Sequence, residues 1–172
     1  FSHSGDLLAC LHRRAMRRGE PADVSDGAGG ASHPHTTPPS PLVTLWRWTS
    51  GEHLASLSSA ALHRIEGPCT RLLWQRPIGG GERLVLLARR TLVLWTPPGL
   101  AALVECTHGQ QGRPAGRLRA AAALATGMLI SGCREGELQL WSATQLLSRT
   151  QAHAGALRAL TVAPDGLRFA SG

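Results

Sequence analysis

The sequence predicts an all-β fold built from consecutive antiparallel sheets of four short strands. The first observation behind this prediction is an apolar strand that ends in Trp and recurs at Trp46, Trp95 and Trp141, with spacings of 49 and 46 residues. The second is the motif Ile130-Ser131-Gly132, which returns 40 residues later as Ala170-Ser171-Gly172. Two independent motifs with a similar period indicate a repeated structural unit.

The third observation is a hairpin that both opens and closes the chain. Residues 1–10 align with residues 162–171, and the alignment places Gly5 on Gly166. Gly between two apolar segments favours a tight turn, because Gly tolerates the positive φ that such turns require. Repeats of about 40 to 45 residues with four strands each are typical of the blades of a β-propeller.

The pattern resembles the WD-repeat (WD40) family, in a degenerate and partial form. A blade of that family runs from a Gly-His start to a second strand ending in Ser-Gly, an Asp-containing turn and a third strand ending in Trp-Asp. In this chain Arg47, Thr96 and Ser142 follow the three tryptophans, so the Asp of the Trp-Asp pair is absent. The resemblance covers almost all residues outside 12–41. It implies a WD40-type β-propeller fragment with about two complete and two partial four-stranded blades in an open ring.

Apolar runs separated by turn residues set the expected strands. A partial first blade over residues 1–58 has its second to fourth strands at 6–11, 42–48 and 53–57. A degenerate second blade over 59–107 has strands at 69–75, 83–88, 91–95 and 101–106. The third blade, 108–152, has strands at 118–125, 128–133, 137–141 and 146–151. The fourth, 153–172, keeps two strands at 157–163 and 167–171.

Two segments stand apart from this pattern. Residues 118–125 are rich in Ala and have high helix propensity, yet their position in the repeat demands a strand. Residues 12–41 contain Gly, Pro, Ser, His and Arg with almost no large apolar side chains. Such a composition does not bury enough surface to offset the entropy of ordering, so we expect a disordered insertion.

The resemblance also implies a polar set that locks each blade: a His at its start, a Ser or Thr on the second strand, an acid in the next turn and the Trp indole. In the third blade the candidates are His108, Ser131, Glu135 and Trp141, with His108 about five residues too far upstream. In the fourth, His153 and Ser171 have the expected spacing of 18 residues. The second blade has Arg89-Arg90 where the acidic turn belongs, so we expect it to lack the set.

Charge suggests partners but does not identify them. The net charge is +7, and all 18 basic residues are Arg. Nucleic-acid binding through an Arg-rich surface is one interpretation. The alternative is a GC-rich coding region, because Lys, Asn and Tyr are all absent. The strongest local cluster is Arg13, Arg14, Arg17 and Arg18, which fits an acidic protein partner, nuclear import, phosphate binding or a solvated loop.

Catalytic and metal signatures are weak. No GxSxG, HExxH or GxxxxGK[ST] motif occurs. Cys10-Leu11-His12 and His33-Pro34-His35 lie in one region but lack the paired spacing of zinc sites, so a solvated loop is the simpler interpretation. We therefore predict no enzyme activity, no cofactor and no metal.

The expected function is a non-catalytic scaffold for protein–protein interaction, with partners of unknown identity. Phe1 at one end and a predicted strand interrupted at Gly172 suggest a part of a larger protein that holds the remaining blades. Four scattered cysteines favour reduced thiols inside the cell. No apolar run has the length of a membrane span. We expect the cytoplasm, with nuclear or cytoskeletal association left open.

Overall fold

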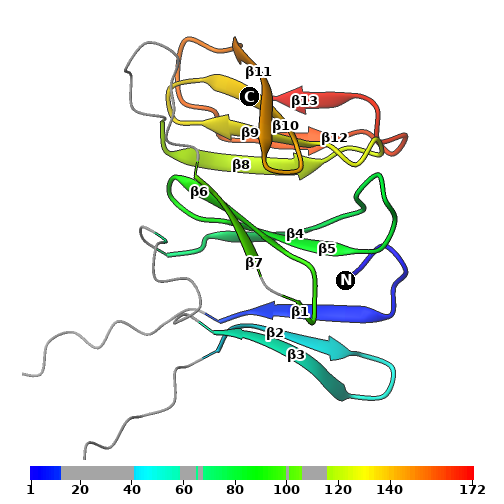
Figure 1. Cartoon of the computed structure of the whole chain (residues 1–172). Coiled ribbons are helices and arrows are strands. Elements are labelled where there is room, and N and C mark those ends of the chain that lie inside the picture. Colours follow the sequence, from blue (N-terminus) through cyan, green and yellow to red (C-terminus); the bar gives the residue numbers. More distant parts are fainter. Residues whose placement is uncertain (13–40, 59–64, 66–67, 100, 106–115) are drawn as a thin grey trace, which may run out of the picture.

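The computed structural model describes residues 1–12, 41–58, 65, 68–99, 101–105 and 116–172. Every regular element in these ranges is a β-strand, and the strands form antiparallel sheets (Figure 1). The predicted all-β class is confirmed. Within the same ranges no helix has the length and apolar character needed to cross a membrane.

Each sheet is a meander, in which strands that follow one another along the chain are hydrogen-bonded neighbours. The first sheet contains β1 (Leu7–Leu11), β2 (Pro41–Arg47) and β3 (Glu52–Ser58). The second contains β4 (Arg71–Gln75), β5 (Arg83–Leu87), β6 (Thr91–Trp95) and β7 (Ala101–Glu105). The third contains β8 (Leu118–Ala123), β9 (Leu129–Cys133), β10 (Glu137–Ser142) and β11 (Gln145–Gln151). The fourth contains β12 (Leu160–Val162) and β13 (Phe169–Ser171).

Strands therefore occur at all the positions expected from the repeat, with ends that differ by a few residues. The largest difference is at β12, which begins at Leu160 rather than at residue 157. The predicted disordered insertion covers residues 12–41, of which 13–40 lie outside the described residues, as do Cys106 and His108, whereas His12 bonds to Thr44 and Pro41 begins β2.

The Ala-rich segment forms strand β8 despite its helix propensity. Its backbone pairs with β9, with Ala121 opposite Ser131. A register irregularity between Leu118 and Ala120 lets Leu118 and Ala121 face the same neighbouring sheet, while Ala120 faces the other. Small side chains suit a strand that lies between two packed sheets, because neighbouring backbones approach closely there. Tertiary packing has overridden local propensity.

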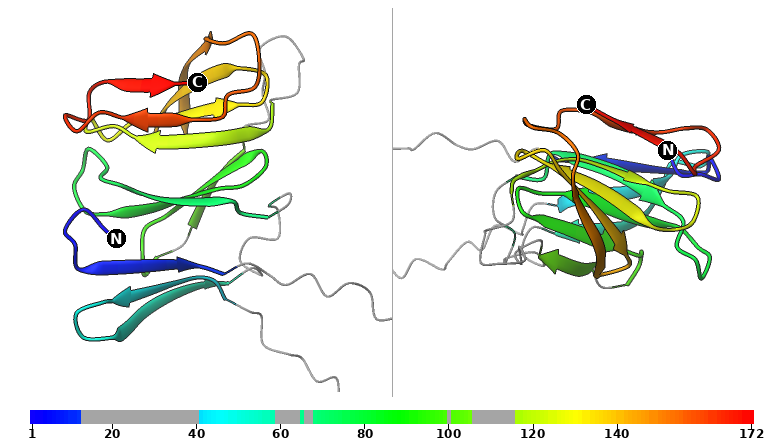
Figure 2. Two further views of the ribbon diagram at one scale, coloured as in Figure 1. Left: turned by 180° about the vertical axis from the view of Figure 1, so that it is seen from behind. Right: turned by 90° about the horizontal axis from the view of Figure 1, so that it is seen from above.

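Sheets pack face to face in chain order (Figure 2). Alternate side chains of the second sheet point to opposite neighbours, as strand geometry requires. Leu84 and Leu86 pack against the first sheet, whereas Val85 and Leu87 pack against the third, and all four are fully buried. This two-sided burial explains why residues 84–88 form an unbroken apolar run instead of an alternating one.

Turns at one end of the sheets connect each sheet to the next. Ser4 donates its backbone N–H to Glu82 Oε1 at 3.0 Å, which joins the first two sheets. Buried Gln75 donates to the Gly127 carbonyl at 2.7 Å, which joins the second and third. Ala125 donates to the Gly166 carbonyl at 2.9 Å, which joins the third and fourth. Gly5 and Gly166 have φ of +82° and +69°, as the predicted hairpin turns require.

Candidate functional site

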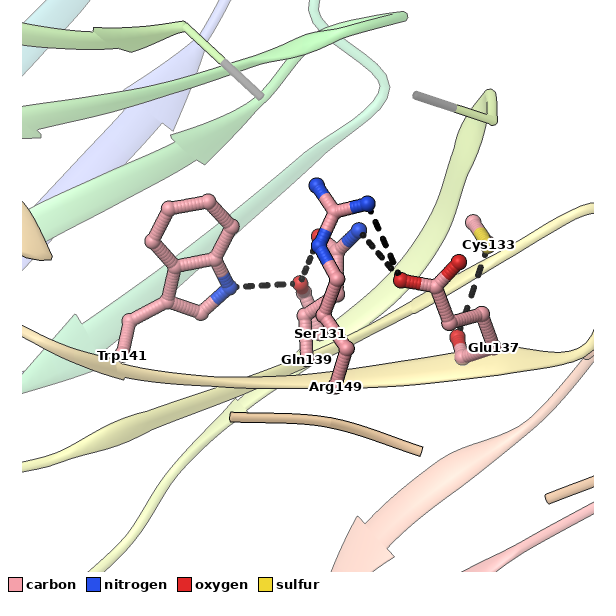
Figure 3. A network of polar contacts seen from close by, with 6 residues as sticks. All are labelled: Ser131, Cys133, Glu137, Gln139, Trp141 and Arg149. Atoms are coloured by element: carbon pink, nitrogen blue, oxygen red, sulfur yellow. Dashed lines mark hydrogen bonds and ion pairs between the residues drawn. The ribbon is translucent and has the colours of Figure 1, made fainter. Parts of the chain in front are cut away.

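A buried polar network surrounds Trp141 in the third sheet (Figure 3). The Trp141 indole donates to Ser131 Oγ at 2.9 Å, and Ser131 donates to Gln139 Oε1 at 3.3 Å. Gln139 Nε2 in turn donates to Glu137 Oε1 at 3.3 Å, and Arg149 Nη1 lies 3.3 Å from the same carboxylate oxygen. The network thus supplies hydrogen-bond partners for the buried side chains of Ser131, Gln139 and Trp141, whereas the Nε of Arg149 is buried without a partner among the described residues.

The structure brings together part of the predicted set in this sheet. Ser131 and Trp141 are bonded, as the repeat suggested. The Glu135 carboxylate lies beside Gly116 instead, and its carbonyl accepts from Gln151. Sequence reasoning missed Gln139 and Glu137, although alternation along β10 places both on the face of Trp141.

Corresponding tryptophans in the other sheets use different acceptors. Trp46 donates to Thr44 Oγ1 at 3.1 Å, and His12 Nε2 lies 2.9 Å from the same hydroxyl. Trp95 donates to the Gly99 carbonyl at 3.0 Å, so no hydroxyl is involved in the second sheet. This is the sheet in which we expected the polar set to be absent.

The fourth sheet contains the predicted His–Ser pair. His153 Nε2 lies 2.8 Å from Ser171 Oγ, across the loop that enters β12. The spacing of 18 residues therefore reflects a direct contact. Which atom donates depends on the tautomer of the imidazole.

Across the described ranges, no group of three or more His, Cys, Asp or Glu side chains is arranged to hold a metal ion. Cys10, Cys69 and Cys133 are free thiols. Burial raises the pKa of Cys69 to about 11 and is also the main cause of the raised pKa of Cys133. Both thiols are therefore protonated near neutral pH, and weak nucleophiles.

A pocket lined by four arginines is the most distinctive feature of the described surface. Its volume is about 480 Å³, and its lining consists of Arg71, Arg119, Arg134, Ala156, Leu157 and Arg158. Arg71 opens β4, Arg119 is the second residue of β8 and Arg134 follows β9, whereas Arg158 precedes β12. The starts of β4 and β8 lie at the same end of the molecule (Figure 1).

These four side chains lack acidic partners among the described residues. The ion pairs among the described residues are Arg47–Glu52, Arg149–Glu137 and Arg168–Asp165, and none of them involves a pocket arginine. The pocket therefore concentrates four formal positive charges that no described carboxylate neutralises. Sequence reasoning missed this cluster, because its members are spread over 88 residues from position 71 to position 158.

The predicted partner-binding cluster, Arg13, Arg14, Arg17 and Arg18, lies outside the described residues. Its attachment points are described. The chain leaves β1 after Leu11 and enters β2 at Pro41, at the end of the molecule where β4 and β8 begin (Figure 1). The attachment points of this segment and the arginine-lined pocket thus lie at the same end of the molecule.

Comparison with known proteins gives no family assignment. No family model matches the chain, and no curated protein matches its sequence. The resemblance to WD repeats accordingly rests on the residues alone.

Proposed function

We propose that this chain is part of a WD-type β-propeller that acts as a non-catalytic scaffold for protein partners. The proposal rests on the strand-pairing register around the tryptophans, which is repeated in three sheets. Trp46 pairs with Leu8, Trp95 with Leu84 and Trp141 with Leu129, so each Trp faces a Leu of the preceding strand in its own sheet. A shared register in three sheets supports three copies of one blade.

The packing between sheets supports the same proposal. Trp95 and Trp141 both lie in the core cluster that joins their sheet to the preceding one. The first strands are neighbours, since β8 contacts both β4 and β12. Meanders that pack face to face with their first strands together are what the blades of a propeller require.

A scaffold function is favoured because binding residues concentrate on loops that a rigid framework holds in place. The fold itself does not determine function. Here the arginine-lined pocket and the attachment points of the 13–40 segment lie at one end, which therefore offers a cationic surface to an acidic partner. We propose this end as the partner-binding end.

The test compares partner recovery by the full-length protein and by a variant in which Arg13, Arg14, Arg17 and Arg18 are changed to Ala. We expect loss of at least one partner identified by mass spectrometry. A control variant removes three arginines at the opposite end of the sheets, Arg47, Arg76 and Arg168. Unchanged partner recovery with the first variant would show that the arginines of the 13–40 segment do not contribute to partner binding.

Nucleic-acid binding is the second candidate, favoured by the net charge of +7 and by the pocket arginines, which have no acidic partner in the part of the chain that the structure describes. Affinity for duplex and single-stranded probes should then fall steeply as salt rises, with a slope that reports the number of phosphates contacted. Binding that is absent or insensitive to salt would exclude this candidate.

A further inference from the structure

We propose that the arginine-lined pocket binds a phosphate monoester group. The proposal deepens the partner-binding function above and rests on it for the source of the ligand. Its starting point is that Arg71, Arg119, Arg134 and Arg158 come from three sheets and line one hollow.

The backbone that carries these arginines is held in place by hydrogen bonds. Arg158 donates its N–H to the Gly172 carbonyl at 2.6 Å, and Arg134 donates to the Arg117 carbonyl at 2.8 Å. Leu157, which lies between the pocket and the core, is fully buried. Its side chain packs directly over Gly132, where a Cβ would come within 2.5 Å of it. The binding groups are therefore mounted on ordered backbone, which lowers the entropy cost of binding.

Charge in the pocket favours an anion. Four guanidinium groups carry their positive charge at any physiological pH, because guanidinium is not deprotonated in proteins. Like charges gathered in one hollow repel one another, so a bound anion relieves that repulsion. An anion that binds only the folded protein should also raise its melting temperature.

A phosphate monoester matches this site better than a single carboxylate. It carries a charge of about −1.5 to −2 near pH 7 and offers three acceptor oxygens. A guanidinium group is planar and presents two parallel N–H donors, so it can bind two such oxygens at once. One phosphoryl group can therefore engage several of the four arginines, whereas one carboxylate has only two oxygens to share.

Nucleic acid fits the pocket less well. Proteins that bind single strands combine a basic groove with aromatic side chains on which bases stack. None of the described residues that line this pocket is aromatic. Its volume of about 480 Å³ is in the range of a small-ligand pocket, roughly 300 to 1,000 Å³, rather than that of an extended track.

The binding test uses the purified full-length protein and three probes: a phosphoserine peptide, its unphosphorylated counterpart and pyrophosphate. Calorimetry or fluorescence anisotropy gives Kd for wild type and for the double variant Arg119→Ala with Arg158→Ala. We expect the double variant to weaken binding of the phosphorylated probes by about tenfold or more, because it removes charge-assisted hydrogen bonds to the phosphoryl oxygens. Arg47→Ala with Arg168→Ala is the matched control and should leave Kd unchanged.

Thermal melting checks that the double variant is folded and provides a second measurement. Pyrophosphate should raise the melting temperature of wild type but not that of the double variant. A preference for the phosphopeptide over pyrophosphate would identify the source as a protein partner. Equal binding of pyrophosphate would identify a free phosphorylated metabolite, and both results support the site.

Three results would overturn the proposal: no binding of phosphorylated probes, equal binding by wild type and double variant, or salt-sensitive DNA binding that alone is lost in the double variant. These failures are distinct from failure of the scaffold function. Partner recovery is scored separately, so a protein that keeps its partners but binds no phosphate would remain a scaffold without this site.

Discussion

At the scale of single residues, each tryptophan indole donates to a different kind of acceptor. Trp141 uses a serine on the neighbouring strand, Trp46 uses Thr44 on its own strand, and Trp95 uses a backbone carbonyl. Burial makes an acceptor necessary, because an unsatisfied indole N–H loses its hydrogen bond to water. The repeat thus preserves the tryptophan and its register, while the acceptor varies with what lies nearby.

The Trp141 network gives a prediction at this scale. Ser131→Ala leaves the indole N–H without its acceptor and Gln139 Oε1 without its donor, so it should lower the free energy of unfolding by about 1 to 3 kcal/mol. In a Trp141→Phe background the indole is already absent, so Ser131→Ala should lower the free energy of unfolding by a smaller amount. Urea unfolding of the four proteins in this double-mutant cycle measures the difference.

Ser148→Ala is a matched control, because Ser148 is exposed on β11. Its effect should stay within about 0.5 kcal/mol of zero. An equal cost of Ser131→Ala in both backgrounds would show that the hydroxyl does not stabilise the fold through Trp141.

At the scale of elements, hairpin turns and strand alternation fix how the sheets meet. Gly136, in the turn between β9 and β10, has φ of +82° and lies against the loop that enters β12. Its carbonyl accepts from the backbone N–H groups of Ala152 and His153, both at 3.1 Å. The same turn therefore connects two strands and holds the start of the next sheet.

A glycine comparison separates these two roles. Gly5 has the same φ of +82° but open space around it, whereas a Cβ on Gly136 would come within 2.1 Å of the His153 carbonyl. Gly5→Ala should therefore cost only the backbone strain, about 1 to 2 kcal/mol. Gly136→Ala should cost at least twice as much, because a backbone contact must also move.

Urea unfolding of the two glycine variants measures both costs. Hydrogen exchange of the 152–160 segment adds a local measurement, since displacement of the loop should speed exchange only in Gly136→Ala. Equal destabilisation by the two substitutions would mean that the loop contact does not constrain Gly136.

At the scale of the whole molecule, stability depends on stacking of neighbouring sheets. The second and third sheets each have a packed neighbour on both faces, whereas the first and fourth have one each in the described part of the chain. In the same residues β1 and β13 each hydrogen-bond to a single strand. Unpaired edges of this kind are templates for association with other chains.

We therefore predict that residues 1–172 produced alone self-associate. Exposed Phe1 and Phe169, at 68% and 44% exposure, add apolar surface near these edges. Size-exclusion chromatography with light scattering should show masses that rise with concentration. A monomer that melts cooperatively would contradict the interpretation of these sheets as blades of a larger ring.

The sequence by itself determined where the strands lie, because alternation, turn glycines and the spacing of the tryptophans are local signals. The long apolar run of the second sheet is also visible in the sequence. The sequence does not show that the two faces of this sheet pack against different sheets. The pairs Ser131 with Trp141 and His153 with Ser171 were expected from the resemblance to WD repeats, which implies these residue types at these positions.

Only the tertiary structure decided which polar groups complete the networks and which charges meet. Gln139 and Glu137 join Trp141 because β9, β10 and β11 bring their side chains to one buried face. The pocket arginines are distant in sequence and meet because the first strands of consecutive sheets pack side by side. Local patterns specify which way a side chain points, but its neighbours across a sheet interface depend on how whole sheets stack.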